Sequence, residues 1–100
     1  MRADTGALWE NFLISERLKL LNSSERWTQR FFWRTTEQQE IDYIEEEEGV
    51  LSAFEFKWNK SGKANISKTF SNAYPNASTA IISQENFDSF IMPNNILSIE

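Results

Sequence analysis

The sequence has 100 residues, 40% of them hydrophobic, a formal net charge of −5, and neither cysteine nor histidine. This length supports one domain with one core, and the apolar content argues against disorder. The missing residue types exclude an ordinary zinc finger, a cysteine nucleophile and a Ser–His–Asp triad. Oxygen ligands remain, and these suit Mg²⁺, Mn²⁺ or Ca²⁺.

No apolar run approaches the roughly 20 residues that a membrane span requires. The absence of cysteine fits a reducing compartment. We therefore expect no membrane partner and a cytoplasmic location.

Apolar periodicity predicts alternating helices and strands. In chain order we expect a helix from about Gly6 to Leu21 that is capped by Asp4 or Thr5, strands at Arg30–Thr35, Glu40–Glu45 and Val50–Trp58, a loop at Lys60–Lys63, a helix from Ile66 to Tyr74, a strand at Ser78–Ser83 and a last helical turn at Phe87–Ile91. The order α-β-β-β-α-β predicts an α/β (α+β) fold with a mixed central sheet flanked by helices. Residues 1–92 would form one domain and residues 93–100 a tail.

Charge is unevenly distributed along the chain. Seven acidic residues and no basic ones lie between Glu37 and Glu48, and four lysines with no acids lie between Phe56 and Gln84. The favoured interpretation is a solvated hairpin tip beside a basic loop.

The central hairpin determines which acidic side chains meet. If Glu48 and Gly49 form a two-residue turn, Asp42 lies opposite Glu55, and Glu40 lies opposite Lys57. The period of two then divides the side chains between two faces. Asp42, Ile44, Leu51, Ala53, Glu55 and Lys57 would share one face, and Ile41, Tyr43, Phe54, Phe56 and Trp58 would share the other, a core face.

Two opposed carboxylates destabilise a sheet unless a positive charge lies between them. A divalent cation would supply that charge, and Lys57 would place an ammonium beside it. Carboxylates that hold Mg²⁺, together with a lysine that assists the attacking water, suit phosphodiester hydrolysis. The alternative, which spacing alone favours, is a solvated face with a Glu40–Lys57 ion pair and with Asp42 and Glu55 exposed.

Glu10 is a candidate for a third carboxylate over this face. It shares a helical stripe with Leu13, Ile14 and Arg17 and should point toward the sheet. Two other roles for it stay open, as an ion-pair partner of Arg17 or as an early-turn acid favoured by the helix dipole.

Four short segments together resemble a known family. They are Gly6-Ala7-Leu8-Trp9-Glu10-Asn11, Phe32-Trp33-Arg34-Thr35, Gln39-Glu40-Ile41-Asp42-Tyr43 and Phe54-Glu55-Phe56-Lys57-Trp58. Their order and spacing over about residues 6–91 resemble the C-terminal domain of prokaryotic AAA-type ATPases of the archaeal type. That domain belongs to the PD-(D/E)xK nuclease-like superfamily, which has the restriction-endonuclease-like fold.

The resemblance implies a site of Glu10, Asp42, Glu55 and Lys57. In the superfamily the two strand acids hold Mg²⁺ (or Mn²⁺) and the lysine assists the attacking water, and Glu10 would be the supplementary helical acid. Gln39 and Arg34 would contact the phosphate backbone. Ile41 stands where the superfamily has proline, which is common among divergent members.

The implied partners are DNA and the N-terminal ATPase module of the parent protein. These residues contain no P-loop, so the chain itself would not hydrolyse ATP. A rival interpretation keeps the fold without the catalysis, as a protein-interaction or regulatory module. The four tryptophans and the acidic hairpin tip suit that role as well.

Overall fold

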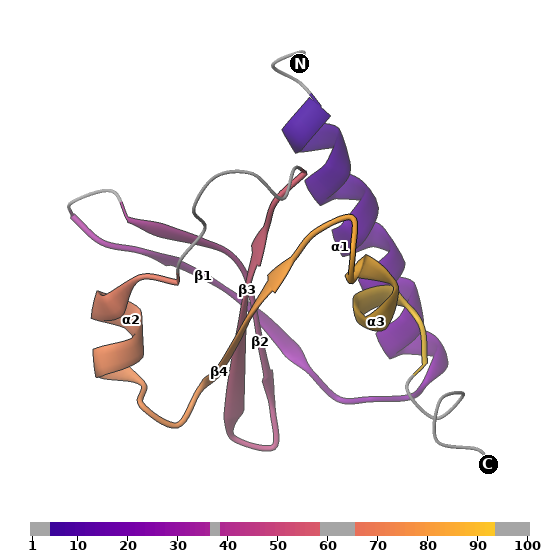
Figure 1. Ribbon diagram of the computed structural model, residues 1–100. Coiled ribbons are helices and arrows are strands. Elements are labelled where there is room, and N and C mark those ends of the chain that lie inside the picture. Colours follow the sequence, from indigo (N-terminus) through magenta and orange to yellow (C-terminus); the bar gives the residue numbers. More distant parts are fainter. Residues whose placement is uncertain (1–4, 37–38, 59–65, 94–100) are drawn as a thin grey trace.

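The computed structural model describes residues 5–36, 39–58 and 66–93. Seven elements follow one another in this part of the chain: α1 (Thr5–Ser23), β1 (Gln29–Arg34), β2 (Glu40–Glu47), β3 (Val50–Phe56), α2 (Lys68–Ala73), β4 (Ser78–Ile82) and α3 (Phe87–Ile91) (Figure 1). The Asp4 cap, the Lys60–Lys63 loop and nearly all of the predicted tail lie outside the described residues. No helix of the described part is long and apolar enough to cross a membrane.

The four strands form one mixed sheet in the order β1-β2-β3-β4. The first three strands are antiparallel, and β4 runs parallel to β3. Helices α1 and α3 lie together on one face, and α2 lies on the other (Figure 1). The predicted mixed α/β class and its flanked central sheet are confirmed.

One element begins later than the sequence predicted. Helix α2 starts at Lys68 and not at Ile66, because the Ser67 hydroxyl accepts a hydrogen bond from the Thr69 N–H and caps the helix. Ile66 precedes the helix and packs against the sheet.

Apolar side chains are buried on both faces of the sheet, so the expected single core is in fact two clusters. The α1/α3 cluster comprises Trp9, Leu13, Tyr43, Phe56, Ile82 and Phe90. The α2 cluster comprises Ile41, Ile44, Ala53 and Phe70. The predicted division of hairpin residues is confirmed for Ile44, Leu51 and Ala53 against Tyr43, Phe54, Phe56 and Trp58.

Ile41 is the exception, because it belongs to the α2 cluster. Phe31 pairs with Ile44 and Trp33 with Ile41, so Phe32 alone lies opposite both Asp42 and Tyr43. Between these two pairs β2 has one residue more than β1. This irregularity is a β-bulge, and it shifts the alternation of side chains along β2. A strict period of two cannot detect it.

The hairpin turn has the predicted two residues. Glu47 pairs with Val50 and Tyr43 with Phe54, which confirms the predicted register. Glu48 and Gly49 both have positive φ, at 54° and 82°. Such a turn matches the right-handed twist of the strands, and glycine adopts its conformation without steric cost.

A buried ion pair joins α1 to the sheet. Arg17 donates from Nε and Nη2 to both carboxylate oxygens of Glu45, at 2.7 and 3.0 Å, and from Nη1 to the Phe90 carbonyl at 2.8 Å. The Tyr43 hydroxyl donates to the same carboxylate at 2.9 Å. Burial, and then the charge of Glu45, raise the pKa of Tyr43, which keeps this donor protonated. Arg17 is 8% exposed and Glu45 3%.

Removing one member of this pair should destabilise the fold severely. Arg17→Met would leave the Glu45 carboxylate buried without its cation, at a cost of about 3–5 kcal/mol in the free energy of unfolding. Urea denaturation followed by circular dichroism measures it.

Two controls accompany this measurement. Arg26→Met removes an exposed ion pair with Glu47 and should cost less than about 1 kcal/mol. The triple variant Arg17→Met, Tyr43→Phe, Glu45→Leu removes all three polar groups and should recover most of the loss. A small effect of Arg17→Met would contradict the assignment.

A second prediction concerns the turn. Glu48→Asn should raise the free energy of unfolding by about 0.5–1 kcal/mol, because asparagine tolerates positive φ better than glutamate. Gly49→Ala should lower it, although a Cβ there would meet no atom within 4 Å. Equal stabilities of all three proteins in thermal denaturation would contradict the role of φ.

Candidate functional site

The two strand acids lie where the β2–β3 ladder ends. The last residue pair is Tyr43 with Phe54. Beyond it, the Phe56 N–H donates to Asp42 Oδ2 at 2.9 Å, and the Asp42 N–H donates to Glu55 Oε1 at 3.3 Å. The carboxylates thus replace the main-chain ladder, and Asp42 and Glu55 are neighbours as the register predicted.

Asp42 is also one of the two bulge residues opposite Phe32. It lines a surface depression of about 270 Å³ together with Ile14 of α1 and Arg30, Phe31, Phe32 and Tyr43 of the sheet. The depression therefore joins β1, the bulge and the helix that carries Glu10.

Three carboxyl groups from three elements influence one another at this point. Burial, followed by the charges of Asp42 and Glu10, raises the pKa of Glu55 to about 7. Burial, followed by Asp42 and Glu40, raises the pKa of Glu10. The charge of Asp42 therefore contributes to the raised pKa of both other acids. Glu10 lies on the helical stripe of Ile14 and Arg17, and Ile14 lines the same depression as Asp42.

The acids are not prearranged as a complete ion shell. Within residues 5–36, 39–58 and 66–93, no three acidic side chains are spaced to hold a metal ion as they stand. The oxygens of Asp42 and Glu55 accept main-chain hydrogen bonds instead. The donor type and the concentrated negative charge nevertheless suit a hard divalent cation.

Lys57 lies directly after β3, and its N–H donates to the Ile82 carbonyl at 2.8 Å. In the described part of the chain its ammonium forms no ion pair. The alternative Glu40–Lys57 ion pair is therefore wrong, because Glu40 binds Arg34 at 3.2 Å. The exposed acids of that alternative are wrong as well, since Asp42 and Glu55 are both half-buried.

One of the roles left open for Glu10, as the ion-pair partner of Arg17, is also corrected. Arg17 binds Glu45 and is not the partner of Glu10. The side-chain oxygen of Gln39 accepts a hydrogen bond from Ser67 at 2.7 Å. The guanidinium of Arg34 lies 5.0 Å from the centre of the Phe32 ring.

The acidic run is more than a solvated hairpin tip. Glu45 is buried with Arg17, Glu47 binds Arg26, and Glu46 accepts a hydrogen bond from the Gly49 N–H at 2.7 Å. Sequence reasoning missed Arg30 and Phe32, which line the depression beside Asp42. Their alternation in the predicted strand Arg30–Thr35 was the available signal.

Fold and site define the chain as a mixed α+β domain in which Asp42 and Glu55 meet where the ladder between β2 and β3 ends. It belongs to the family described as Domain of unknown function (DUF4143), whose model matches residues 5–99. No curated protein and no solved structure matches the chain.

The raised pKa of Glu55 predicts that the stability of the fold depends on pH. The folded protein keeps this proton up to about pH 7, whereas the unfolded chain releases it near the ordinary glutamate value. The unfolded state therefore binds fewer protons in this range, so the free energy of unfolding falls as pH rises from about 4.5 to 7.

Glu55→Gln should remove this dependence while keeping an acceptor for the Asp42 N–H. We expect the variant to be about 1–2 kcal/mol more stable than the parent at pH 8 and similar at pH 4.5, a figure reduced because the carboxyl group is only half-buried. Urea denaturation at several pH values measures it. Parallel pH profiles of parent and variant would contradict the shift.

Proposed function

We propose that this chain is a nuclease-like domain of the restriction-endonuclease-like class that binds DNA and hydrolyses phosphodiesters with Mg²⁺ or Mn²⁺. The observation that carries the proposal is the contact between Asp42 of β2 and Glu55 of β3 where their ladder ends, together with Glu10 of α1, because burial and neighbouring acids raise the pKa of both Glu55 and Glu10. Neighbouring carboxylates that repel one another are kept at functional sites where a cation compensates them.

In this proposal Asp42 and Glu55 hold the metal and Glu10 supplements them. When bound, the metal lowers the pKa of water and neutralises charge on the phosphate. Mg²⁺ retains several waters and needs few protein ligands, which suits a site with two adjacent carboxylates and a third close by. Binding would exchange the main-chain contacts of Asp42 and Glu55 for the cation.

Lys57 would orient the attacking water and stabilise the developing negative charge. Its lack of an ion partner within the described residues supports this role, because an unpaired ammonium is available to a substrate phosphate. The motor module of the parent ATPase, to which the sequence resemblance points, would supply movement along DNA. A cytoplasmic location belongs to the same proposal.

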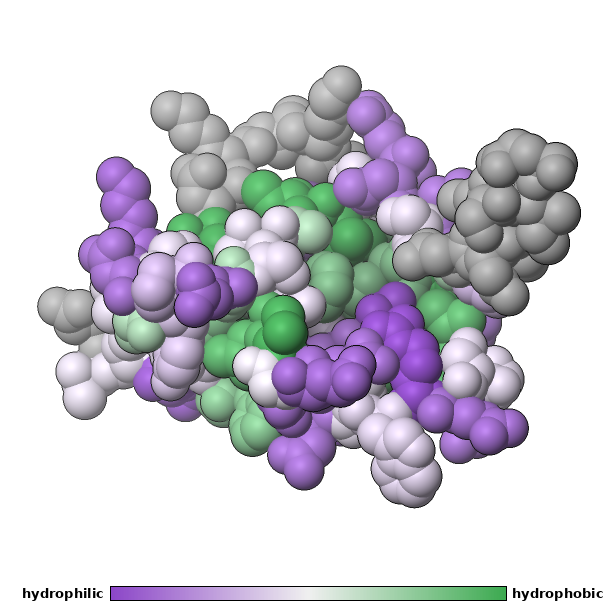
Figure 2. Space-filling model, turned by 90° about the horizontal axis from the view of Figure 1, so that it is seen from below, coloured by the Kyte–Doolittle hydropathy of each residue, from purple (hydrophilic) through white to green (hydrophobic). Residues whose placement is uncertain are grey.

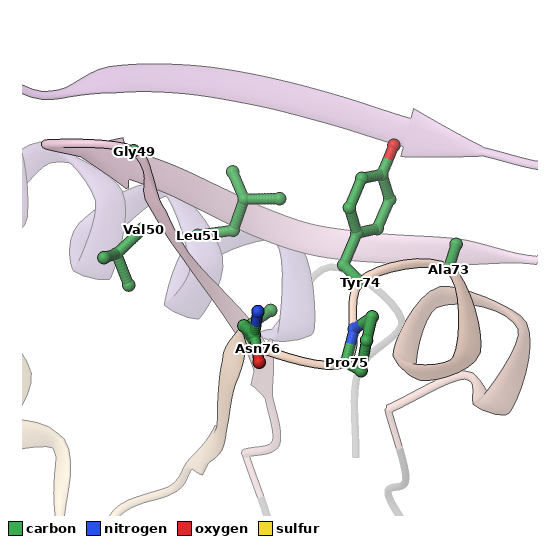
Figure 3. A pocket seen from close by; sticks show the side chains of 8 residues that line it. Gly49, Val50, Leu51, Ala73, Tyr74, Pro75 and Asn76 are labelled. Carbon is green, nitrogen blue, oxygen red and sulfur yellow. The ribbon is translucent and has the colours of Figure 1, made fainter.

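A second candidate function is that of a catalytically inactive interaction module. A groove of about 430 Å³ lies between the hairpin and the end of α2, where Leu51 and Tyr74 project toward the same side (Figure 3). An adjoining depression of about 200 Å³ shares these two residues and includes Phe31 and Trp33. Seen from the hairpin-turn end, the surface shows apolar side chains among hydrophilic ones (Figure 2). Such surfaces suit a protein partner, including the ATPase module.

Metal binding separates the two candidates. Mn²⁺ at millimolar concentration should broaden the amide NMR signals of Asp42, Glu55 and Phe56, because a paramagnetic ion relaxes nearby nuclei. Asp42→Asn keeps the acceptor for the Phe56 N–H but removes the charge, and should weaken Mn²⁺ binding at least tenfold. Asp88→Asn on α3 is the control, because it removes an acid whose charge does not contribute to the raised pKa of Glu10 or Glu55.

Catalysis is tested separately by nicking of supercoiled DNA. Lys57→Met should leave Mn²⁺ broadening intact and abolish nicking, whereas Asp42→Asn should abolish both. Unchanged spectra in Mn²⁺, together with no DNA binding at low salt, would overturn the nuclease proposal and favour the interaction module.

A further inference from the structure

Three side chains of β1 alternate along one face of the sheet: Arg30, Phe32 and Arg34. The period of two places them together. The Arg34 guanidinium lies over the Phe32 ring, and Arg30 and Phe32 both line the depression that contains Asp42. We call these three residues the Arg–Phe–Arg stripe. It lies next to the acid cluster, at the edge of the sheet formed by β1.

The Phe32 side chain belongs to neither of the two hydrophobic clusters. It is 69% exposed, and within the described residues its ring contacts no other aromatic ring. Its neighbour Trp33, on the opposite face, packs edge-on against Phe70 at 5.5 Å between ring centres. An aromatic ring left in solvent, with the Arg34 guanidinium over one face, offers its other π-face to a ligand.

Neighbouring acids do not fully neutralise the charges of Arg30 and Arg34. Arg30 pairs in register with Glu45, but that carboxylate is already engaged by Arg17 and Tyr43. In the described ranges Arg30 therefore has no ion-pair partner. Arg34 binds Glu40 in an exposed pair at 3.2 Å, and such pairs contribute little and exchange readily for a phosphate.

We propose that the Arg–Phe–Arg stripe binds single-stranded nucleic acid. One base stacks on Phe32, and Arg30 and Arg34 contact phosphates on either side of it. This inference deepens the proposed function, on which it rests, by naming the substrate as an unpaired strand. The strand would pass along β1 and present its backbone to Glu10, Asp42 and Glu55.

The chemistry favours an unpaired strand over a duplex. A ring that lies on a sheet face can stack only on a base that has left its own stack. The two arginines lie about 13 Å apart along the strand, so they span a short run of extended backbone. The site also carries four acids, Glu10, Glu40, Asp42 and Glu55, which would repel phosphate unless a divalent cation is bound. Binding should therefore require such a cation.

Fluorescence anisotropy with a labelled oligonucleotide tests the inference. The full chain in Ca²⁺, which carboxylates bind, should bind the single strand at least tenfold more tightly than the matching duplex. Phe32→Ala should weaken single-strand binding by about tenfold, within the range for loss of one stacked base. Trp27→Ala is the matched control, because this ring is 92% exposed but lies outside β1. It should leave the affinity unchanged.

Arg30→Gln should make the affinity less dependent on salt, lowering the slope of log affinity against log salt by about 0.7. Circular dichroism verifies that each variant is folded. Equal affinity for duplex and single strand, or the same affinity in Phe32→Ala as in the parent, overturns the inference. So does tight binding of a protein partner with no binding of either nucleic acid.

The metal experiment distinguishes the two proposals. If Mn²⁺ broadens Asp42 and Glu55 while Phe32→Ala has no effect, the metal site stands and the stripe is overturned. If Phe32→Ala weakens single-strand binding about tenfold while Mn²⁺ leaves the acids unaffected, the stripe is supported, and both metal-dependent cleavage and the cation requirement are overturned.

Discussion

The Arg17–Glu45 ion pair is the constraint on which the rest of this structure depends. It connects the middle of α1 to β2, and through the Phe90 carbonyl it also holds α3. Because a buried guanidinium is stable only with all its partners in place, the pair fixes both the height and the rotation of α1 over the sheet. Glu10 lies seven residues, or two helical turns, before Arg17, so this rotation also turns Glu10 toward Asp42.

The candidate site lies where regular pairing stops. The bulge at Asp42 and Tyr43 changes which face β2 presents, and the ladder between β2 and β3 gives way to side-chain contacts of Asp42 and Glu55. Burial, and then the charges of the neighbouring acids, raise the pKa of Glu55 and of Glu10 and oppose folding near neutral pH. A fold that keeps such an arrangement gains from a cation or a proton that relieves it. The proposed metal function follows from this charge, and so does the cation requirement proposed for the Arg–Phe–Arg stripe.

Much of the site could be predicted from the hairpin alone. Gly49 in a two-residue turn fixes the register, and the register makes Asp42 and Glu55 neighbours whatever the rest of the chain does. The position of Lys57 could not be derived in this way, because β3 ends at Phe56 and its last residue pair with β2 is already Tyr43 with Phe54. The ion partner of Arg17 was equally out of reach, since helical spacing pointed to Glu10 and the actual acid lies 28 residues along the chain.

The sequence by itself determined the order of the elements, the hairpin register and the mixed α+β class, because periodicity and turn chemistry are local properties. Tertiary structure decided which side chains are buried and which segments cover them. It placed Trp9 in the core, left Trp27 in solvent and moved Ile41 to the opposite face through one extra residue in β2. These outcomes depend on contacts between segments far apart in the chain, and no local pattern encodes which of several acids, arginines or aromatic rings will meet.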